Sequence, residues 1–96
     1  MKIHLKSNFL IPGVEDREHI ELAGNEITLR QLLEELQRLS GPVPIEYVRP
    51  GARALDPDDW EAEINDIPYQ KCDHELETLL KDGDTVNIKI MSLGGG

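Results

Sequence analysis

Aromatic side chains are scarce in this chain of 96 residues, since Phe, Trp and Tyr together make up only 4% of it. A hydrophobic core with so few aromatics must rest on Leu, Ile and Val. The length suits one domain, near the size at which a single core becomes sufficient. We therefore expect one domain with a small, aliphatic core.

Cysteine is almost absent as well, because Cys72 is the only one. A single cysteine forms no internal disulfide, and a zinc or iron–sulfur site needs several ligands. The three histidines, His4, His19 and His74, are scattered. We expect no metal site and no cofactor bound by the chain itself. Cys72 near His74 leaves a thiolate pair open, but a small, partly buried loop residue is the commoner role.

Two further absences concern enzymatic activity and membranes. No glycine-rich phosphate loop follows a strand, which argues against a stand-alone enzyme. There is neither a basic start followed by an apolar run nor a run of about 18 apolar residues. We therefore expect no signal peptide, no transmembrane helix and a cytoplasmic location.

Basic residues are outnumbered, with 10 Lys and Arg against 19 Asp and Glu and a net charge of -9. Such a balance opposes binding to nucleic-acid phosphates or to an anionic membrane and favours a basic protein partner. Simple solubility explains the same acidity equally well.

The first part of the chain alternates in the manner of strands. In residues 2–6, Ile3 and Leu5 lie on one face and polar residues on the other. Residues 19–22 alternate again after the turn signal Pro12-Gly13. An antiparallel hairpin with a polar loop is predicted.

A helix over about residues 28–40 is the clearest element. Thr28 and Gln31 have the spacing of a capping box, and Gly41-Pro42 supplies a stop signal. One face carries a leucine stripe, which is typical of a helix packed on a core: Leu29, Leu32, Leu33, Leu36 and Leu39.

The rest of the chain is less regular. We expect residues 45–48 to form a short strand or extended piece. Residues 56–59 predict the cap of a short helical turn that contains Trp60, which we expect in the core or as a lid. Residues 62–69 predict a strand, or two strands divided at Asn65-Asp66. A short helix is predicted near residues 74–80, followed by a turn and a final strand over residues 85–91.

This order of elements predicts an α+β domain over residues 1–91. Its mixed sheet of four or five strands is covered by one main helix, and the first and last strands pair in parallel at the sheet centre. We expect residues 92–96 to form a flexible glycine tail, since glycine loses the most backbone freedom when it is fixed.

The sequence Asp82-Gly83-Asp84-Thr85-Val86, the alternating strand after it and the closing Gly95-Gly96 together resemble the ubiquitin-like β-grasp sulfur carriers of the ThiS and MoaD type. Ile64-Asn65-Asp66-Ile67-Pro68 is similar to the strand and turn before their short helix, with Asp66 where Gly is common. The long connection over residues 41–60 departs from the smallest members of the family.

The resemblance implies a carrier, not an enzyme. A ubiquitin-activating-type adenylyltransferase would use ATP and Mg to adenylate the Gly96 carboxylate, and a sulfur donor would convert it to a thiocarboxylate. A sulfur-accepting synthase subunit of thiamine thiazole or molybdopterin synthesis would then receive the sulfur. Gly94 and Gly95 would thread a narrow channel, and Leu93 and Met91 would contact the partner.

Two other readings remain open at this point. The same activated Gly96 suits a ubiquitin-like modifier joined to target lysines. Alternatively, the chain is a non-catalytic β-grasp binding module whose glycines are only a frayed end.

Overall fold

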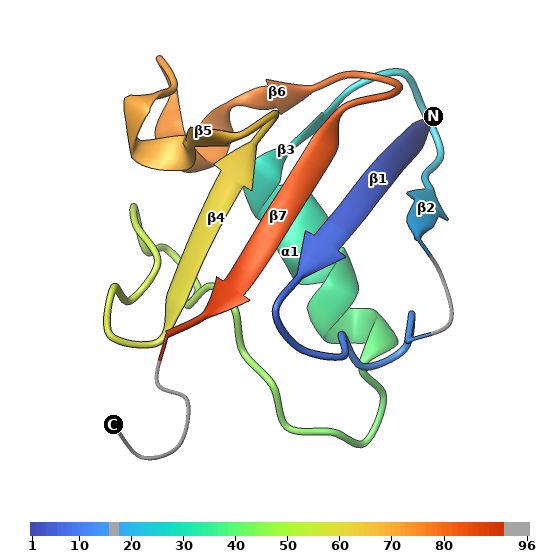
Figure 1. The fold of residues 1–96 in the computed structure, drawn as a ribbon, viewed down its shortest axis with the longest axis vertical. Coiled ribbons are helices and arrows are strands. Elements are labelled where there is room, and N and C mark those ends of the chain that lie inside the picture. Colours follow the sequence, from blue (N-terminus) through green and yellow to red (C-terminus); the bar gives the residue numbers. More distant parts are fainter. Residues whose placement is uncertain (16–17, 92–96) are drawn as a thin grey trace.

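The computed structural model describes residues 1–15 and 18–91. A five-stranded sheet has the order β2-β1-β7-β4-β5, with β1 (Lys2–Ser7), β2 (His19–Glu21), β4 (Trp60–Ile64), β5 (Ile67–Pro68) and β7 (Thr85–Ile90). The helix α1 (Leu29–Leu39) lies across one face of this sheet (Figure 1). The predicted α+β fold is confirmed, and the arrangement is compatible with a β-grasp.

The central strand β7 pairs in parallel with β1, as the sequence predicted. On its other side it pairs antiparallel with β4. Val86 and Ile88 point into the core and are fully buried. Their partners in the register include Leu5 of β1 and Ala62 of β4. The predicted hairpin of β1 and β2 is also present, with Ile3 opposite Ile20.

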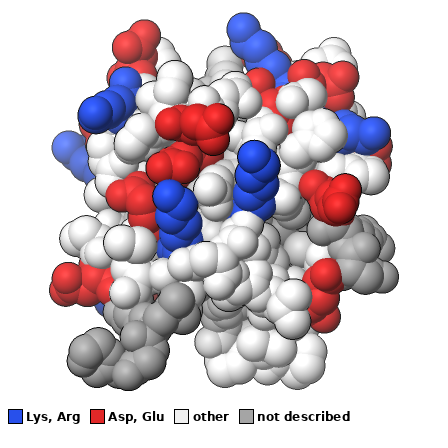
Figure 2. Space-filling view, viewed as in Figure 1, with Lys and Arg blue, Asp and Glu red and all other residues white. Residues whose placement is uncertain are grey.

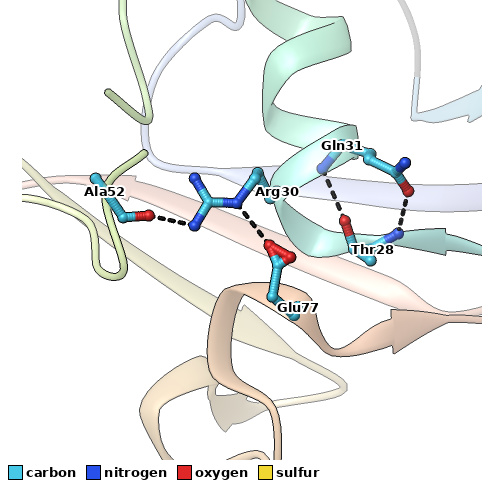
Figure 3. A network of polar contacts seen from close by, with 5 residues as sticks. All are labelled: Thr28, Arg30, Gln31, Ala52 and Glu77. Atoms are coloured by element: carbon cyan, nitrogen blue, oxygen red, sulfur yellow. Dashed lines mark hydrogen bonds and ion pairs between the residues drawn. The ribbon is translucent and has the colours of Figure 1, made fainter. Parts of the chain in front are cut away.

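Local signals fix the start of α1. The Thr28 side chain accepts a hydrogen bond from Gln31 N, and the Gln31 side chain accepts one from Thr28 N, which completes the capping box (Figure 3). The inward leucines are fully buried: Leu29, Leu32, Leu33 and Leu36. Ser40 is the C-cap, so the predicted bounds of 28–40 differ from the helix only by its two caps.

The short helix predicted near residues 74–80 is present, but it covers only three of these residues. It is a turn of 3₁₀ helix, η2 (Glu75–Glu77), and the strand β6 (Leu79–Leu80), which was not predicted, follows it. β6 pairs antiparallel with β3 (Ile27–Thr28) in a separate two-stranded sheet. Leu80 is buried and Leu79 is 49% exposed, so the leucines alternate as in a strand.

The connection between α1 and β4 also differs from prediction. Residues 45–48 form no strand; the backbone N–H groups of Tyr47 and Val48 donate instead to Gln37 Oε1 at 2.9 and 2.8 Å. Residues 57–59 form a turn without a helix, and Trp60 opens β4. Trp60 does lie in the core, 8% exposed, with its ring centroid 4.7 Å from that of Tyr47.

The alternative of two strands within residues 62–69 is confirmed. Asn65 and Asp66 have φ of 51° and 68° between β4 and β5, as a tight hairpin turn requires. After β5 comes a turn of 3₁₀ helix, η1 (Tyr69–Lys71).

Arg30 ties three parts of the chain together near the start of α1. Its Nε donates to Glu77 Oε1 of η2 at 2.6 Å, and its Nη2 donates to the Ala52 carbonyl oxygen (Figure 3). The Arg30 side chain is only 19% exposed. The long connection is therefore anchored to the helix that covers the sheet.

Candidate functional site

The end of β7 is held from both sides. Asn8, which directly follows β1, accepts a hydrogen bond from Ile90 N at 2.8 Å and donates one to Ile90 O at 3.0 Å. On the other side, Met91 N donates to Asp59 O at 2.8 Å. These hydrogen bonds hold the backbone up to residue 91. This end of β7 lies next to Trp60, the first residue of β4.

Most of the predicted site lies beyond this point. Leu93, Gly94, Gly95 and Gly96 lie outside the described residues. Met91 is described and is 53% exposed. The sequence placed it on the last strand, but β7 ends at Ile90, so Met91 follows the strand.

An exposed leucine near the strand end was not singled out from the sequence. Leu10 is 75% exposed, and it lies two residues after Asn8, which bonds to Ile90. The run Phe9-Leu10-Ile11 before Pro12-Gly13 was the available signal, since three consecutive apolar residues cannot all point into the core from one strand. Ile11 is buried, whereas Leu10 faces solvent.

The loop that carries Leu10 is packed firmly on α1. Gly13 has φ of +92°, and a Cβ built there would lie 2.1 Å from the backbone oxygen of Leu39. Only glycine permits this approach. Ile11 and Val14 are buried on either side of it, so Leu10 is presented from an anchored loop.

Two loops at this end of the molecule lack charged residues. Residues 7–14 and 39–45 carry no Asp, Glu, Lys or Arg, and these loops lie at the end of the sheet where β7 terminates (Figure 1). Figure 2 shows an uncharged area there, whereas basic and acidic side chains alternate over the rest of the open sheet face. An uncharged surface therefore borders one side of the end of β7, whereas Asp59 lies on the other side.

The remaining candidate groups are dispersed. His4 and His19 lie opposite each other on β1 and β2, with ring centroids 6.4 Å apart. Cys72 is partly buried, and its Sγ lies 3.8 Å from the Pro68 carbonyl oxygen. Within residues 1–15 and 18–91, no three His, Cys, Asp or Glu side chains are grouped so that they would hold a metal ion. In the same ranges no helix has the length and apolar run needed to cross a bilayer.

No protein-family model matches this chain, and no curated protein is significantly similar to it. Among solved structures, the chain is similar to the solution structure of the Haloferax volcanii HVO 2177 protein, with a TM-score of 0.66 and 20% identity. The match covers 99% of this chain and 87% of that one. A likeness at this identity shows a shared fold and carries no information about function.

Proposed function

We propose that this chain is a sulfur carrier whose Gly96 carboxylate is converted to a thiocarboxylate and then gives its sulfur to a small-molecule acceptor. The observation that carries the proposal is the fixed end of β7. Asn8 donates to and accepts from the Ile90 backbone, and Asp59 O accepts from Met91 N. The loops on the Asn8 side carry no charged residue over residues 7–14 and 39–45. A short glycine tail leaving from such an end is well suited to enter a partner.

The chemistry assigns little to the chain itself. A carboxylate is a poor electrophile, so an adenylating partner must first join it to AMP, with pyrophosphate released from ATP. A sulfur nucleophile then attacks the acyl carbon, and AMP leaves. Extended backbone covers about 3.3–3.6 Å per residue, so residues 92–96 span roughly 17 Å, enough for Gly96 to reach a buried nucleotide.

The partners and location follow from this chemistry. The chain would bind a ubiquitin-activating-type adenylyltransferase and then a sulfur-accepting synthase subunit. ATP, Mg and the sulfur donor would all be used by the partner, and the carrier would bind no cofactor of its own. Because the first step consumes ATP, we propose a cytoplasmic location.

Mass spectrometry of the intact chain tests the proposal. The chain is incubated with its adenylating partner, ATP and a sulfur donor, and we expect the terminal carboxylate to exchange one oxygen for sulfur. A chain without Gly96 should fold normally and remain unmodified. An unchanged mass with a partner that forms the adenylate would contradict the carrier function.

The second candidate is a protein modifier, because an activated Gly96 also reacts with lysine amines. Adducts between this chain and target lysines in cells, lost when Gly96 is removed, would favour that role. A third candidate is a binding module that is never activated. Failure to form any adenylate, with partner binding retained in the chain without Gly96, would favour it.

A further inference from the structure

The last residue of β7 extends beyond the end of the strand that pairs with it in parallel. The last registered pair of β1 and β7 is Ser7 with Ile88. β1 ends at Ser7, whereas β7 continues to Ile90, and both strands run toward the same end of the sheet (Figure 1). The edge of β7 that faces β1 therefore has no strand beside it at Ile90.

The backbone groups of Ile90 point toward this edge. Along a strand, the N–H and C=O groups of successive residues point alternately to its two neighbours. The Asp84 carbonyl oxygen accepts a hydrogen bond from His4 N at 2.9 Å, so Asp84 faces β1. Ile90 lies an even number of residues later and faces β1 as well, whereas Met91 faces β4 and donates to Asp59 O. The sheet alone would thus leave a donor and an acceptor of Ile90 unpaired.

The side chain of Asn8 takes the place of the absent strand. Its Oδ1 accepts a hydrogen bond from Ile90 N at 2.8 Å, and its Nδ2 donates one to Ile90 O at 3.0 Å. A side-chain amide offers an acceptor and a donor, as a backbone peptide group does, whereas a carboxylate has no donor and alanine has neither group. We call these two hydrogen bonds the Asn8 clamp.

Neighbouring contacts hold the backbone that carries Asn8. Ser7 Oγ donates to Phe9 O at 2.5 Å and so closes a turn around Asn8. The Phe9 ring centroid lies 5.5 Å from that of Trp60, the β4 residue that is registered with Ile90. The Asn8 clamp is therefore formed in advance, and groups that are already ordered lose less free energy on binding.

We propose that Asn8 is a positioning residue for the tail, because the Asn8 clamp keeps Ile90 and Met91 in the sheet and gives the tail a fixed starting point. The reaction in which the tail is used rests on the proposed function. Fixing the backbone of a residue costs conformational entropy. Without the clamp, Ile90 and Met91 would leave the sheet, and the partner would have to order them when it binds.

The first test measures amide hydrogen exchange of the full chain by NMR. In Asn8→Ala, the amides of Ile90 and Met91 should exchange about tenfold faster, the factor that corresponds to loss of one hydrogen bond of roughly 1.4 kcal/mol. The Met91 amide is the critical one, because it donates to Asp59 O and not to Asn8. Its exchange rises only when the clamp holds the strand end as a unit.

The matched control is Asn65→Ala, because Asn65 bonds to the other end of the same strand. Asn65 Oδ1 accepts from Thr85 N at 3.0 Å, and Asn65 Nδ2 donates to Asp84 Oδ1 at 3.1 Å. Asn65 also has φ of 51°, so alanine there adds backbone strain to the loss of hydrogen bonds. This variant should leave exchange of the Met91 amide unchanged. Unchanged exchange of Met91 in Asn8→Ala, or an equal rise in Asn65→Ala, would overturn the proposal.

The second test measures adenylate formation by the partner over a range of concentrations of the chain. In Asn8→Ala we expect KM to rise about tenfold and kcat to stay the same, because binding must order Ile90 and Met91 while the chemistry at Gly96 is unaltered. In Asn65→Ala, which loses stability at the other end of β7, both constants should match those of the unaltered chain. A lower kcat at constant KM in Asn8→Ala, or the same rise of KM in Asn65→Ala, would contradict a positioning role.

The two tests separate this proposal from the carrier function. Hydrogen exchange involves neither ATP nor a partner, so it decides whether Asn8 holds the end of β7 when the unaltered chain forms no adenylate. That failure would contradict the carrier function alone. Conversely, equal KM values for Asn8→Ala and an unaltered chain that is adenylated would keep the carrier function and overturn the role of Asn8.

Discussion

Two buried tyrosines differ in a single respect that decides what each hydroxyl does. Tyr69 Oη accepts a hydrogen bond from Leu55 N, whereas the Tyr47 hydroxyl has no partner. Both side chains are almost fully buried. A buried hydroxyl without a hydrogen bond lowers the stability of the folded state, because it loses its hydrogen bonds to water and gains none in the protein. A buried apolar C–H group at the same position has no such cost.

Removal of the two hydroxyls should therefore have opposite effects on stability. We expect Tyr47→Phe to leave the free energy of unfolding unchanged or to raise it by about 1 kcal/mol, and Tyr69→Phe to lower it by about 1–3 kcal/mol, because Leu55 N loses its acceptor. Urea unfolding at neutral pH measures both. A clear loss of stability in Tyr47→Phe would show that its hydroxyl is paired in solution.

The buried Tyr47 should also make the folded protein less stable at alkaline pH. Burial raises its pKa from 10.0 to about 12, so the folded chain holds this proton more tightly than the unfolded chain. The stabilisation is complete below pH 10 and is lost as the pH rises from 10 toward 12. Urea unfolding across this range should show a smaller loss for Tyr47→Phe than for the unaltered chain. An equal loss would contradict the raised pKa of Tyr47.

At the scale of single elements, the loop between β1 and β2 depends on a close approach to α1. Gly13 and Gly83 have nearly the same φ, +92° and +90°. A Cβ on Gly13 would meet the Leu39 backbone, whereas a Cβ on Gly83 meets nothing within 4 Å. The two glycines separate the cost of a positive φ from the cost of a backbone collision.

Gly13→Ala should consequently destabilise the protein more than Gly83→Ala. For Gly83→Ala we expect about 1–2 kcal/mol from the left-handed backbone alone. For Gly13→Ala we expect a larger loss, because the loop must also move off α1. Thermal unfolding of the two variants measures the difference, and equal losses would show that the loop yields without cost.

Sequence reasoning succeeded for elements with strong local signals and failed for those without them. The capping box and leucine stripe of α1 act within one helix, and the alternation in β1 and β7 acts within one strand. Leu76, Leu79 and Leu80 suit either a helix or a strand by spacing. Pairing of β6 with β3 decided between them, and that contact joins residues far apart in the chain.

At the scale of the whole molecule, charge is distributed unevenly. The chain has a net charge of -9, yet the loops over residues 7–14 and 39–45 contain no charged residue. Both lie at the end of the sheet where β7 terminates (Figure 1). A partner that takes the tail would meet the exposed Leu10 and Met91 first.

Placing a charge at this end should weaken activation without unfolding the domain. We expect Leu10→Asp and Met91→Asp each to reduce the rate of adenylate formation about tenfold, as for loss of a buried apolar contact of about 1.4 kcal/mol. Leu79→Asp is the control, because Leu79 is also exposed but belongs to β6 on another sheet. The same loss in all three variants would show that no particular end is recognised.

Leu93 allows a related test of the tail. Leu93→Asp should weaken binding to the adenylating partner and leave the thermal unfolding temperature unchanged, because the residue lies beyond β7. Binding by calorimetry and unfolding by circular dichroism measure the two effects. An equal drop in thermal stability would mean that Leu93 packs in the core.

The sequence by itself determined the α+β class, the bounds of α1, the parallel pairing of β1 with β7 and the expectation of a glycine tail. These depend on periodicity and end signals that neighbouring residues carry. Only the tertiary structure decided the course of residues 43–59, the exposure of Leu10 and the packing of Tyr47 on Trp60. Those features depend on contacts that Gln37, Arg30 and Gly13 make with residues distant in the sequence. Local sequence patterns do not predict such contacts, because the patterns reflect only neighbouring residues.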